Sequence, residues 1–271
     1  MSDIVKQINW FQNYEYILLN ILGILLLMGF SAYAARRYIV NSYNMLFYVA
    51  GIPIMFILGA RLFYLFFFSD LNNPAVSFLA LKSYGFSLYG GLLGSVFYFA
   101  VIAWLGRIPV WDWLDLHTPG LMAYVAAGKT GCFINGCCFG TPTLMPWGIT
   151  YTDGSQAYNY YIVRALDNLQ FQSWQVYSDR LHPVQLYESG LALLLLFFAV
   201  TLLRKKNMPG SVFLLITGSY SLLRAGLFYL RASGDIGTWY HLLPWFYIII
   251  AGLSLGTLII KAIHQKTALS E

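Results

Sequence analysis

The sequence predicts an all-α integral membrane protein with about seven transmembrane helices and a small external head. Of the 271 residues, 59% are hydrophobic and only 10% are charged, with a mean hydropathy of +0.62. A soluble domain carries roughly a quarter charged residues, so one water-exposed globule cannot accommodate this composition. The apolar residues also gather in windows of roughly 18–22 residues, which is long enough to cross a bilayer as helices. A membrane β-barrel would instead show shorter segments of alternating polarity.

The apolar windows divide the chain into its expected elements. The expected spans cover residues 16–35, 45–68, 86–105, 114–134, 183–203, 210–230 and 242–262. The longest polar stretch, about residues 139–181, is rich in Tyr, Asn, Gln, Asp and Trp. We interpret it as an external head inserted between the fourth and fifth spans of a single domain that covers residues 1–271.

Basic residues mark alternate connections between the expected spans. These residues are Arg36, Arg37, Arg107, Arg204, Lys205, Lys206, Lys261 and Lys266. Cytoplasmic loops carry the excess of Lys and Arg, so we expect an outside N-terminus and a cytoplasmic C-terminus. The first twenty residues lack the cleavage pattern of a signal peptide, and we expect no removed leader. The net charge of +5 comes without a long basic run, which argues against a nucleic-acid partner.

A few ionisable side chains fall inside or at the edge of the expected spans. They are Arg61, Lys129, Glu188, Arg224 and Arg231. Charges at membrane depth are costly and usually mark function. Four cations against one carboxylate leave an excess of positive charge, which an anionic lipid headgroup would balance through its phosphate oxygens. The alternative is that a cation such as Arg231, near a span end, extends to the interface and binds nothing specific.

Two glycine-rich segments suggest close approach of the backbone to another group. They are SYGFSLYGGLLGS, residues 83–95, and GKTGCFINGCCFG, residues 128–140. Glycine permits close approach to a ligand, but small residues four apart also pack membrane helices together. Helix packing does not explain why a lysine, an asparagine and three cysteines share the second segment. The residues expected to approach substrate are Gly90, Gly91, Asn135 and Gly140.

Cys132, Cys137 and Cys138 lie within seven residues and have three interpretations. They are small buried apolar residues, or one is a catalytic nucleophile with a lowered thiol pKa, or they bind a metal. A metal site made of Cys pairs normally has a second cluster of ligands, and none follows here. The first interpretation is therefore preferred, and we expect neither a metal nor another cofactor.

The segment HPVQLYES, residues 182–189, leads directly into the fifth apolar run. Pro183 fits the first turn of a helix. In one interpretation the motif fixes the helix start, and Glu188 pairs with Arg224 or Arg61. In the other, His182 and Glu188 supply acid–base chemistry at the membrane surface.

These segments occur in a fixed order: GARLFY, SLYGGLLG, GKTGCFINGCCFG, HPVQLYES and then an arginine in the next span. In this order they resemble the prolipoprotein diacylglyceryl transferase family over nearly the whole chain, with F-I-N-G and H-P-V-Q-L-Y-E the most specific matches. The resemblance implies an enzyme of the bacterial cytoplasmic membrane with an outward-facing active site. Such enzymes move a diacylglyceryl group from phosphatidylglycerol to a cysteine thiol of a lipoprotein precursor and release glycerol phosphate.

The chain departs from the pattern of this family at several positions. Tyr89 stands where the family commonly has His, Lys129 where it has Arg, Cys132 where it has Asn, and Cys137 and Phe228 where it has Glu. Lysine keeps the charge of arginine but loses its two-pronged fork, and a phenol is a poor base near neutral pH. The resemblance implies phosphate binding by Arg61, Lys129, Arg224 and Arg231. The catalytic candidates are His182, Tyr89, Glu188 and Lys129.

Three classes of function therefore stay open from the sequence. The first is transfer of a diacylglyceryl group from an anionic phospholipid, with phosphatidylglycerol expected, to a lipoprotein precursor. The second is a related transfer to a different acceptor, and the third is a lipid-binding membrane protein without catalysis. A transporter is disfavoured because no inverted repeat or matched pair of interrupted helices is visible.

Overall fold

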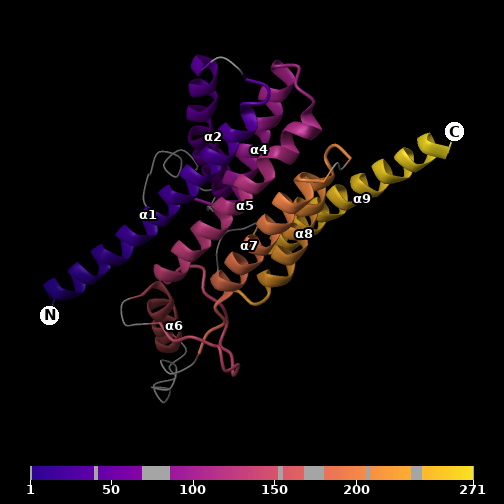
Figure 1. Ribbon diagram of the computed structural model, residues 1–271. Helices are drawn as coiled ribbons and strands as arrows, with labels where there is room; N and C mark the ends of the chain where they lie inside the picture. The colour runs from indigo at the N-terminus through magenta and orange to yellow at the C-terminus, as the bar shows by residue number, and fades with distance from the viewer. Residues whose placement is uncertain are drawn as a thin grey trace.

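The structure is a computed structural model that describes residues 2–39, 42–68, 86–151, 155–167, 180–205, 208–232 and 240–270. Within these ranges the chain is helical, and β structure is limited to isolated bridges. The helices are α1 (Ser2–Ala35), α2 (Ser42–Phe68), α4 (Leu88–Leu105), α5 (Val110–Ile134), α6 (Gln156–Asp167), α7 (Val184–Leu203), α8 (Ser211–Phe228) and α9 (Leu243–Ser270), with a 3₁₀ turn at Tyr240–Leu242 (Figure 1).

Six helical segments are long and apolar enough to cross a membrane, so the chain is a multi-pass membrane protein. They are Tyr14–Ala35, Tyr43–Phe67, Leu88–Leu105, Val184–Leu203, Ser211–Phe228 and Tyr240–Thr267. The expected span 114–134 coincides with α5, which is 25 residues long but carries Asp112, Asp115 and Lys129. The total of seven spans and the orientation of the termini remain predictions.

Helix α5 is less apolar than its neighbours because its side chains face protein. It packs against α1, α4, α7 and α8, and Figure 1 shows it in the middle of the bundle. Most of its residues between Trp113 and Cys132 are buried. A helix enclosed by other helices can hold polar groups that a lipid-facing helix cannot, because those groups find partners inside the protein.

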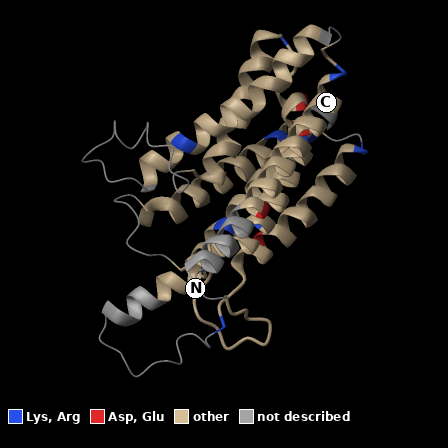
Figure 2. Cartoon of the chain, turned by 90° about the vertical axis from the view of Figure 1, so that its left-hand side faces the viewer, with Lys and Arg blue, Asp and Glu red and all other residues tan. Residues whose placement is uncertain are grey.

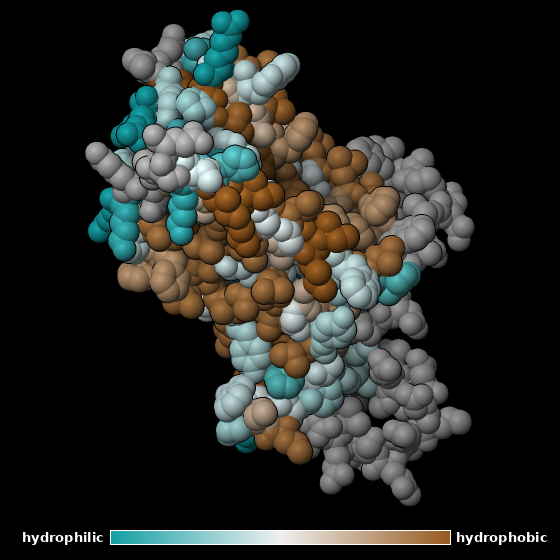
Figure 3. Space-filling model, turned by 90° about the vertical axis from the view of Figure 1, so that its right-hand side faces the viewer, coloured by the Kyte–Doolittle hydropathy of each residue, from teal (hydrophilic) through white to brown (hydrophobic). Residues whose placement is uncertain are grey.

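The outer surface of the bundle is apolar over its middle. Exposed Leu, Ile and Phe side chains cover α1, α2, α7 and α9. In Figure 3 the hydrophobic residues cover the middle of the molecule, and hydrophilic residues gather toward its ends. Figure 2 shows that Lys, Arg, Asp and Glu are sparse along the helices. This distribution fits a bilayer around the bundle, where apolar side chains are exposed to lipid.

Helices α2 and α4 pack closely because glycines line their contact. A Cβ on Gly94 would meet the Met55 carbonyl oxygen and lie 3.0 Å from the Gly59 Cα atom. A Cβ on Gly90 would meet the Gly59 carbonyl oxygen and the Phe63 side chain. Small residues four apart give membrane helices this close approach. Gly90 and Gly91 are thus part of the helix contact, and their expected approach to substrate stays a prediction.

Replacing Gly94 with Leu is expected to destabilise the protein by about 1–3 kcal/mol, because the side chain forces α2 away from α4. Thermal unfolding of the protein in detergent measures the change. Gly29 on α1 has open space around a built Cβ, which makes Gly29→Leu the matched control. Equal unfolding temperatures for the two variants would contradict the close contact of α2 with α4.

Described residues of the expected head form a small unit at one end of the bundle (Figure 1), and the external position of this unit stays a prediction. Phe139, Ala157 and Leu181 form its core, and Tyr151, Tyr160, Tyr161 and Ala232 pack against them. Residue 181 forms bridges with residues 142 and 149, and residue 140 pairs with residue 231. The segment after α8 therefore joins the unit, which the expected boundaries of 139–181 did not include. Residues 152–154 and 168–179 lie outside the described part of the chain.

Candidate functional site

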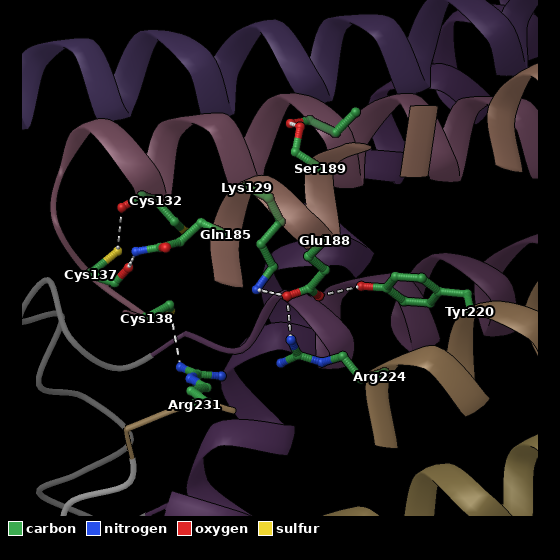
Figure 4. Close-up of polar contacts among 11 residues, drawn as sticks. Lys129, Cys132, Cys137, Cys138, Gln185, Glu188, Ser189, Tyr220, Arg224 and Arg231 are labelled. Atoms are coloured by element: carbon green, nitrogen blue, oxygen red, sulfur yellow. Dashed lines mark hydrogen bonds and ion pairs between the residues drawn. The ribbon is translucent and has the colours of Figure 1, made fainter. Parts of the chain in front are cut away.

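A buried ion-pair cluster joins the ends of three helices (Figure 4). Lys129 Nζ on α5 lies 2.8 Å from Glu188 Oε2 on α7, and Arg224 Nη1 on α8 lies 2.5 Å from the same oxygen. Tyr220, one turn before Arg224, donates a 2.8 Å hydrogen bond to Glu188 Oε1. We call Lys129, Glu188, Tyr220 and Arg224 the carboxylate cluster. The pairing of Glu188 with Arg224, one of two partners suggested by the sequence, is confirmed.

Hydroxyl contacts between α5 and α7 fix the position of the cluster. The Ser189 hydroxyl lies 3.0 Å from the Thr130 hydroxyl and donates a 3.0 Å hydrogen bond to the Ala126 carbonyl oxygen. Thr130 and Ser189 each directly follow a charged member of the cluster in the sequence. The two helices are therefore joined at the level where Lys129 meets Glu188.

The cluster carries more positive than negative charge in a buried position. Lys129 and Glu188 are each 2% exposed, and Arg224 is nearly buried. Two cations share one carboxylate, which leaves one positive charge in a setting of low polarity. The Nε atom of Arg224 is also buried and has no hydrogen-bond partner in the described ranges. A buried donor without a partner is costly, and an anionic ligand would satisfy both the donor and the charge.

Tyr89 lies beside the carboxylate cluster. Its hydroxyl is 2.8 Å from the Ser221 hydroxyl on α8, and its ring stacks near the ring of Tyr220, with centroids 6.3 Å apart. Tyr247 on α9 contacts the Tyr89 ring at 4.8 Å, and the Arg224 guanidinium lies 5.6 Å from the Tyr247 ring centroid. The Tyr247 ring therefore lies within cation–π range of the guanidinium.

The three cysteines converge next to this cluster. Their sulfur atoms lie within 4.8 Å of one another, and none forms a disulfide. Arg231 Nη2 donates a 3.0 Å hydrogen bond to the Cys138 sulfur. Hydrogen bonds from the thiols of Cys132 and Cys137 lower the pKa of Cys138 well below its usual range, and the nearby charge of Arg231 lowers it further. We call Cys132, Cys137 and Cys138 the thiol cluster.

Gln185 connects the thiol cluster to α7. Its Nε2 atom donates to the Cys137 carbonyl oxygen at 2.6 Å and lies 2.8 Å from the Tyr151 hydroxyl. Gln185 is 1% exposed, one turn before Glu188 on the same helix face. Asn135, an expected substrate contact, caps the end of α5 at the start of the same turn. One end of α7 thus contacts both clusters.

The structure places His182 in the head, at the entrance of α7. Its Nδ1 atom lies 3.3 Å from the Tyr187 hydroxyl, which in turn accepts a 2.7 Å hydrogen bond from Trp147 Nε1. Its backbone pairs with residues 140 and 141. Glu188 lies about 6 Å further along the helix than Val184, the first helical residue, at about 1.5 Å per residue. The acid–base role expected for His182 stays a prediction.

The other expected binding residues lie on different elements. Arg61 is buried on α2, with its guanidinium 5.5 Å from the Phe86 ring centroid and 6.0 Å from that of Tyr64. Gly140 lies against the His182 backbone in the head, and its carbonyl oxygen accepts a hydrogen bond from Tyr161. Substrate contact by either residue stays a prediction.

Comparison with known proteins assigns the chain to a family. A family model described as prolipoprotein diacylglyceryl transferase matches residues 3–264, nearly the whole chain. The chain belongs to the prolipoprotein diacylglyceryl transferase family. Membership confirms the resemblance read from the motifs, and the family is one of transferases.

Relatives within the prolipoprotein diacylglyceryl transferase family come from diverse bacteria. A protein of Clostridium tetani is 30% identical over 179 residues, which cover 65% of this chain and 64% of the relative. A protein of Nostoc sp. is 29% identical over 230 residues, covering 80% of this chain and 74% of the relative. One of Tropheryma whipplei is 29% identical over 202 residues, covering 71% and 68%. All three are named phosphatidylglycerol–prolipoprotein diacylglyceryl transferase.

Two features of this family member escaped the sequence analysis. Tyr220 was not among the predicted site residues, although it lies four residues before Arg224 and so on the same helix face. That spacing was the available signal. The hydrogen bond between Arg231 and Cys138 joins residues 93 apart and lies next to the Gly140–Arg231 bridge, and no local pattern indicates it.

Proposed function

We propose that this protein transfers a diacylglyceryl group from phosphatidylglycerol to the cysteine thiol of a lipoprotein precursor. The observation that carries the proposal is the carboxylate cluster, a buried group with excess positive charge in a chain of this family. A phosphodiester is the ionic part of phosphatidylglycerol, and a buried cationic site suits it. The names of the relatives specify the same donor and acceptor.

In this proposal Lys129 and Arg224 bind the phosphate, and Arg231 lies beside them with its guanidinium bonded to Cys138. Arg224 contributes its Nε donor, which has no partner in the described part of the chain, and Lys129 contributes a point charge. Arg231 adds a third cation from the end of α8. These cations stabilise the negative charge that develops on the departing glycerol phosphate.

The transfer exchanges one bond for another at the glycerol carbon. The thiol sulfur of the acceptor attacks the diacylglyceryl carbon that carries the phosphate ester, and the carbon–oxygen bond to phosphate breaks. The products are a thioether and glycerol phosphate. The thiol proton passes to a base, and the electrons of the broken bond leave with the phosphate oxygen, next to the cations.

The contacts support different roles for the expected catalytic residues. Glu188 is held by two cations and a phenol, which supports a positioning role for its carboxylate rather than proton transfer. Tyr89 forms a hydrogen bond with Ser221, and its ring packs against the Tyr247 ring that faces Arg224. His182 is half-buried in the head, and its imidazole is the candidate for accepting the thiol proton.

The charges in the connections between helices support an orientation with the head outside. Figure 1 shows the α1–α2, α4–α5 and α7–α8 connections toward one end of the bundle and α6 at the other. The first group carries Arg36, Arg37, Arg107, Arg204 and Lys205. By the positive-inside rule this end faces the cytoplasm. The head and the carboxylate cluster then face the outer leaflet of the cytoplasmic membrane.

A transfer assay tests the proposed reaction. The purified protein in detergent is mixed with phosphatidylglycerol labelled in its acyl chains and with a peptide that contains a lipobox cysteine. We expect a labelled thioether peptide and one glycerol phosphate released for each. A peptide with serine in place of that cysteine is the control. A folded protein that yields no thioether would refute the proposed acceptor.

His182→Ala is expected to reduce transfer by about 100-fold or more, because a general base contributes on the order of 10²–10⁴ in rate. Exposed His264 on α9 offers the matched control His264→Ala. Both variants are compared by kcat in the transfer assay. Unchanged turnover in the His182 variant would exclude its imidazole as the base.

A second function within this scaffold is transfer to a different acceptor. The observation that favours it is the hydrogen bond that Tyr89 forms with Ser221, at a position where the resemblance leads us to expect a histidine. Release of glycerol phosphate from phosphatidylglycerol with membrane extract, but without lipobox peptide, would support this alternative. Identification of the labelled product by mass spectrometry then gives the acceptor.

A further inference from the structure

The thiol cluster combines three ligand atoms of one chemical kind in one place. Cys132 lies in the last turn of α5, whereas Cys137 and Cys138 lie in the turn that follows. Gly136 and Cys138 adopt φ angles of 64° and 58°. A positive φ is costly for a residue with a side chain, so the turn holds Cys138 in a strained conformation. The turn carries the sulfurs of Cys137 and Cys138 back toward Cys132.

The separation of the sulfurs fits a shared metal ion. All three lie within 4.8 Å of one another. Zinc–sulfur bonds of about 2.3 Å place two sulfur ligands roughly 3.8–4.0 Å apart. Small movements of the side chains therefore bring the three sulfurs to coordination distance. Thiolates are soft ligands, which select zinc or monovalent copper over magnesium and calcium.

The charges around the cluster distinguish between these two ions. Three thiolates carry a charge of −3, and a divalent cation reduces it to −1. The Arg231 guanidinium, 3.0 Å from the Cys138 sulfur, supplies the remaining positive charge. Monovalent copper would leave one negative charge more. A hydrogen bond from a neighbouring group to a metal-bound sulfur is also the usual second layer of a metal site.

Gln185 is the neighbouring side chain that offers an oxygen as a candidate fourth ligand. Its side chain is 1% exposed, and its Nε2 donates to the Cys137 backbone. Its Oε1 atom is buried and lacks a hydrogen-bond partner among the described residues. A buried oxygen without a hydrogen-bond partner is energetically costly. Either a bond to the metal or a hydrogen bond from a metal-bound water would remove this cost.

We propose that Cys132, Cys137 and Cys138 form a zinc site, with Arg231 and Gln185 as its supporting residues. The ion would fasten the end of α5 to the turn that leads into the head. Because Arg231 also follows α8, the site would hold the entrance of α7 and the end of α8 around the carboxylate cluster. The proposal concerns metal binding and does not depend on the transferred group or its acceptor.

Metal content of the full chain tests the proposal directly. The protein, without a histidine tag, is reduced, loaded with Zn²⁺ in detergent without oxygen, and passed through a desalting column. We expect about one zinc ion per chain by mass spectrometry of the metal. Loading with Co²⁺ is expected to give thiolate-to-cobalt charge-transfer bands. The chain has three cysteines in total, so such bands can arise only from this cluster.

Variants distinguish zinc binding by the thiol cluster from nonspecific zinc binding elsewhere on the protein. Each single change, Cys132→Ser, Cys137→Ser or Cys138→Ser, is expected to weaken zinc binding about tenfold or more, and Arg231→Gln about tenfold. His264→Ala, which removes an exposed imidazole, should retain the metal. If a serine variant misfolds, the cobalt spectrum of the unaltered chain still shows whether the three thiols bind a metal ion. Background metal content, missing charge-transfer bands, or a disulfide among the three cysteines after anaerobic reduction would each overturn the zinc site.

Discussion

Glu188→Gln is expected to destabilise the protein by about 3–5 kcal/mol, the largest effect on stability that we predict. Glu188 is 2% exposed and is the shared partner of Lys129 and Arg224. The amide keeps the shape of the side chain but removes its charge. Two buried cations then repel each other without a compensating anion, and burial of unpaired charge is strongly unfavourable.

Thermal or denaturant unfolding in detergent measures this loss. Glu15→Gln on α1 is the matched control, because its carboxylate is exposed. Adding Lys129→Gln to Glu188→Gln should restore part of the stability by removing one of the two unpaired cations. If Glu188→Gln unfolds like the control, or if the second change makes no difference, Glu188 does not compensate the cations.

Arg224→Lys is expected to reduce transfer by about 10- to 100-fold while the protein stays folded. Lysine preserves the positive charge that faces Glu188. Lysine lacks the planar set of N–H donors of the guanidinium, which includes the buried Nε donor. Loss of one charge-assisted hydrogen bond costs about 1.5–3 kcal/mol, which corresponds to this change in rate.

Steady-state kinetics with phosphatidylglycerol distinguish this effect from a general weakening. The decrease should appear in kcat/KM, and unfolding should occur close to the temperature of the unaltered protein. Arg204→Lys, at the exposed end of α7, is the matched control. Equal kcat/KM for the two lysine variants would mean that the guanidinium N–H groups of Arg224 do not contact the phosphate.

The apolar runs made most of the fold predictable. A membrane helix must satisfy its backbone internally and face lipid, so length and composition nearly suffice to place it. Six expected spans match apolar helices. Helix α5 is the instructive exception, because its polar residues are compatible with a span only when other helices surround it. That condition depends on tertiary packing, which hydropathy along the chain does not record.

The candidate site was predictable in its charged members and in the Glu188–Arg224 pair, but not in Tyr220 or in the contacts of the cysteines. Lys129, Glu188 and Arg224 stood out as charges beside apolar runs, and the structure joins them in one cluster. Arg61 satisfied the same criterion, and its guanidinium lies near the rings of Tyr64 and Phe86. The convergence of the cysteines was missed because it depends on positive φ angles in the turn at residues 136–138. The sequence spacing alone is equally compatible with separated thiols.

The central claim is that the carboxylate cluster recognises the phosphate of an anionic glycerophospholipid. Its most direct test is the identity of the bound lipid after the protein has equilibrated in nanodiscs with equal amounts of phosphatidylglycerol and phosphatidylcholine. After extraction in mild detergent, mass spectrometry counts the lipids that remain on each chain. We predict enrichment of phosphatidylglycerol on the unaltered protein, and loss of that enrichment in Lys129→Met and Arg224→Lys but not in Arg204→Lys. Retention of both lipids in equal amounts, or an enrichment that survives both cluster variants, would contradict the account.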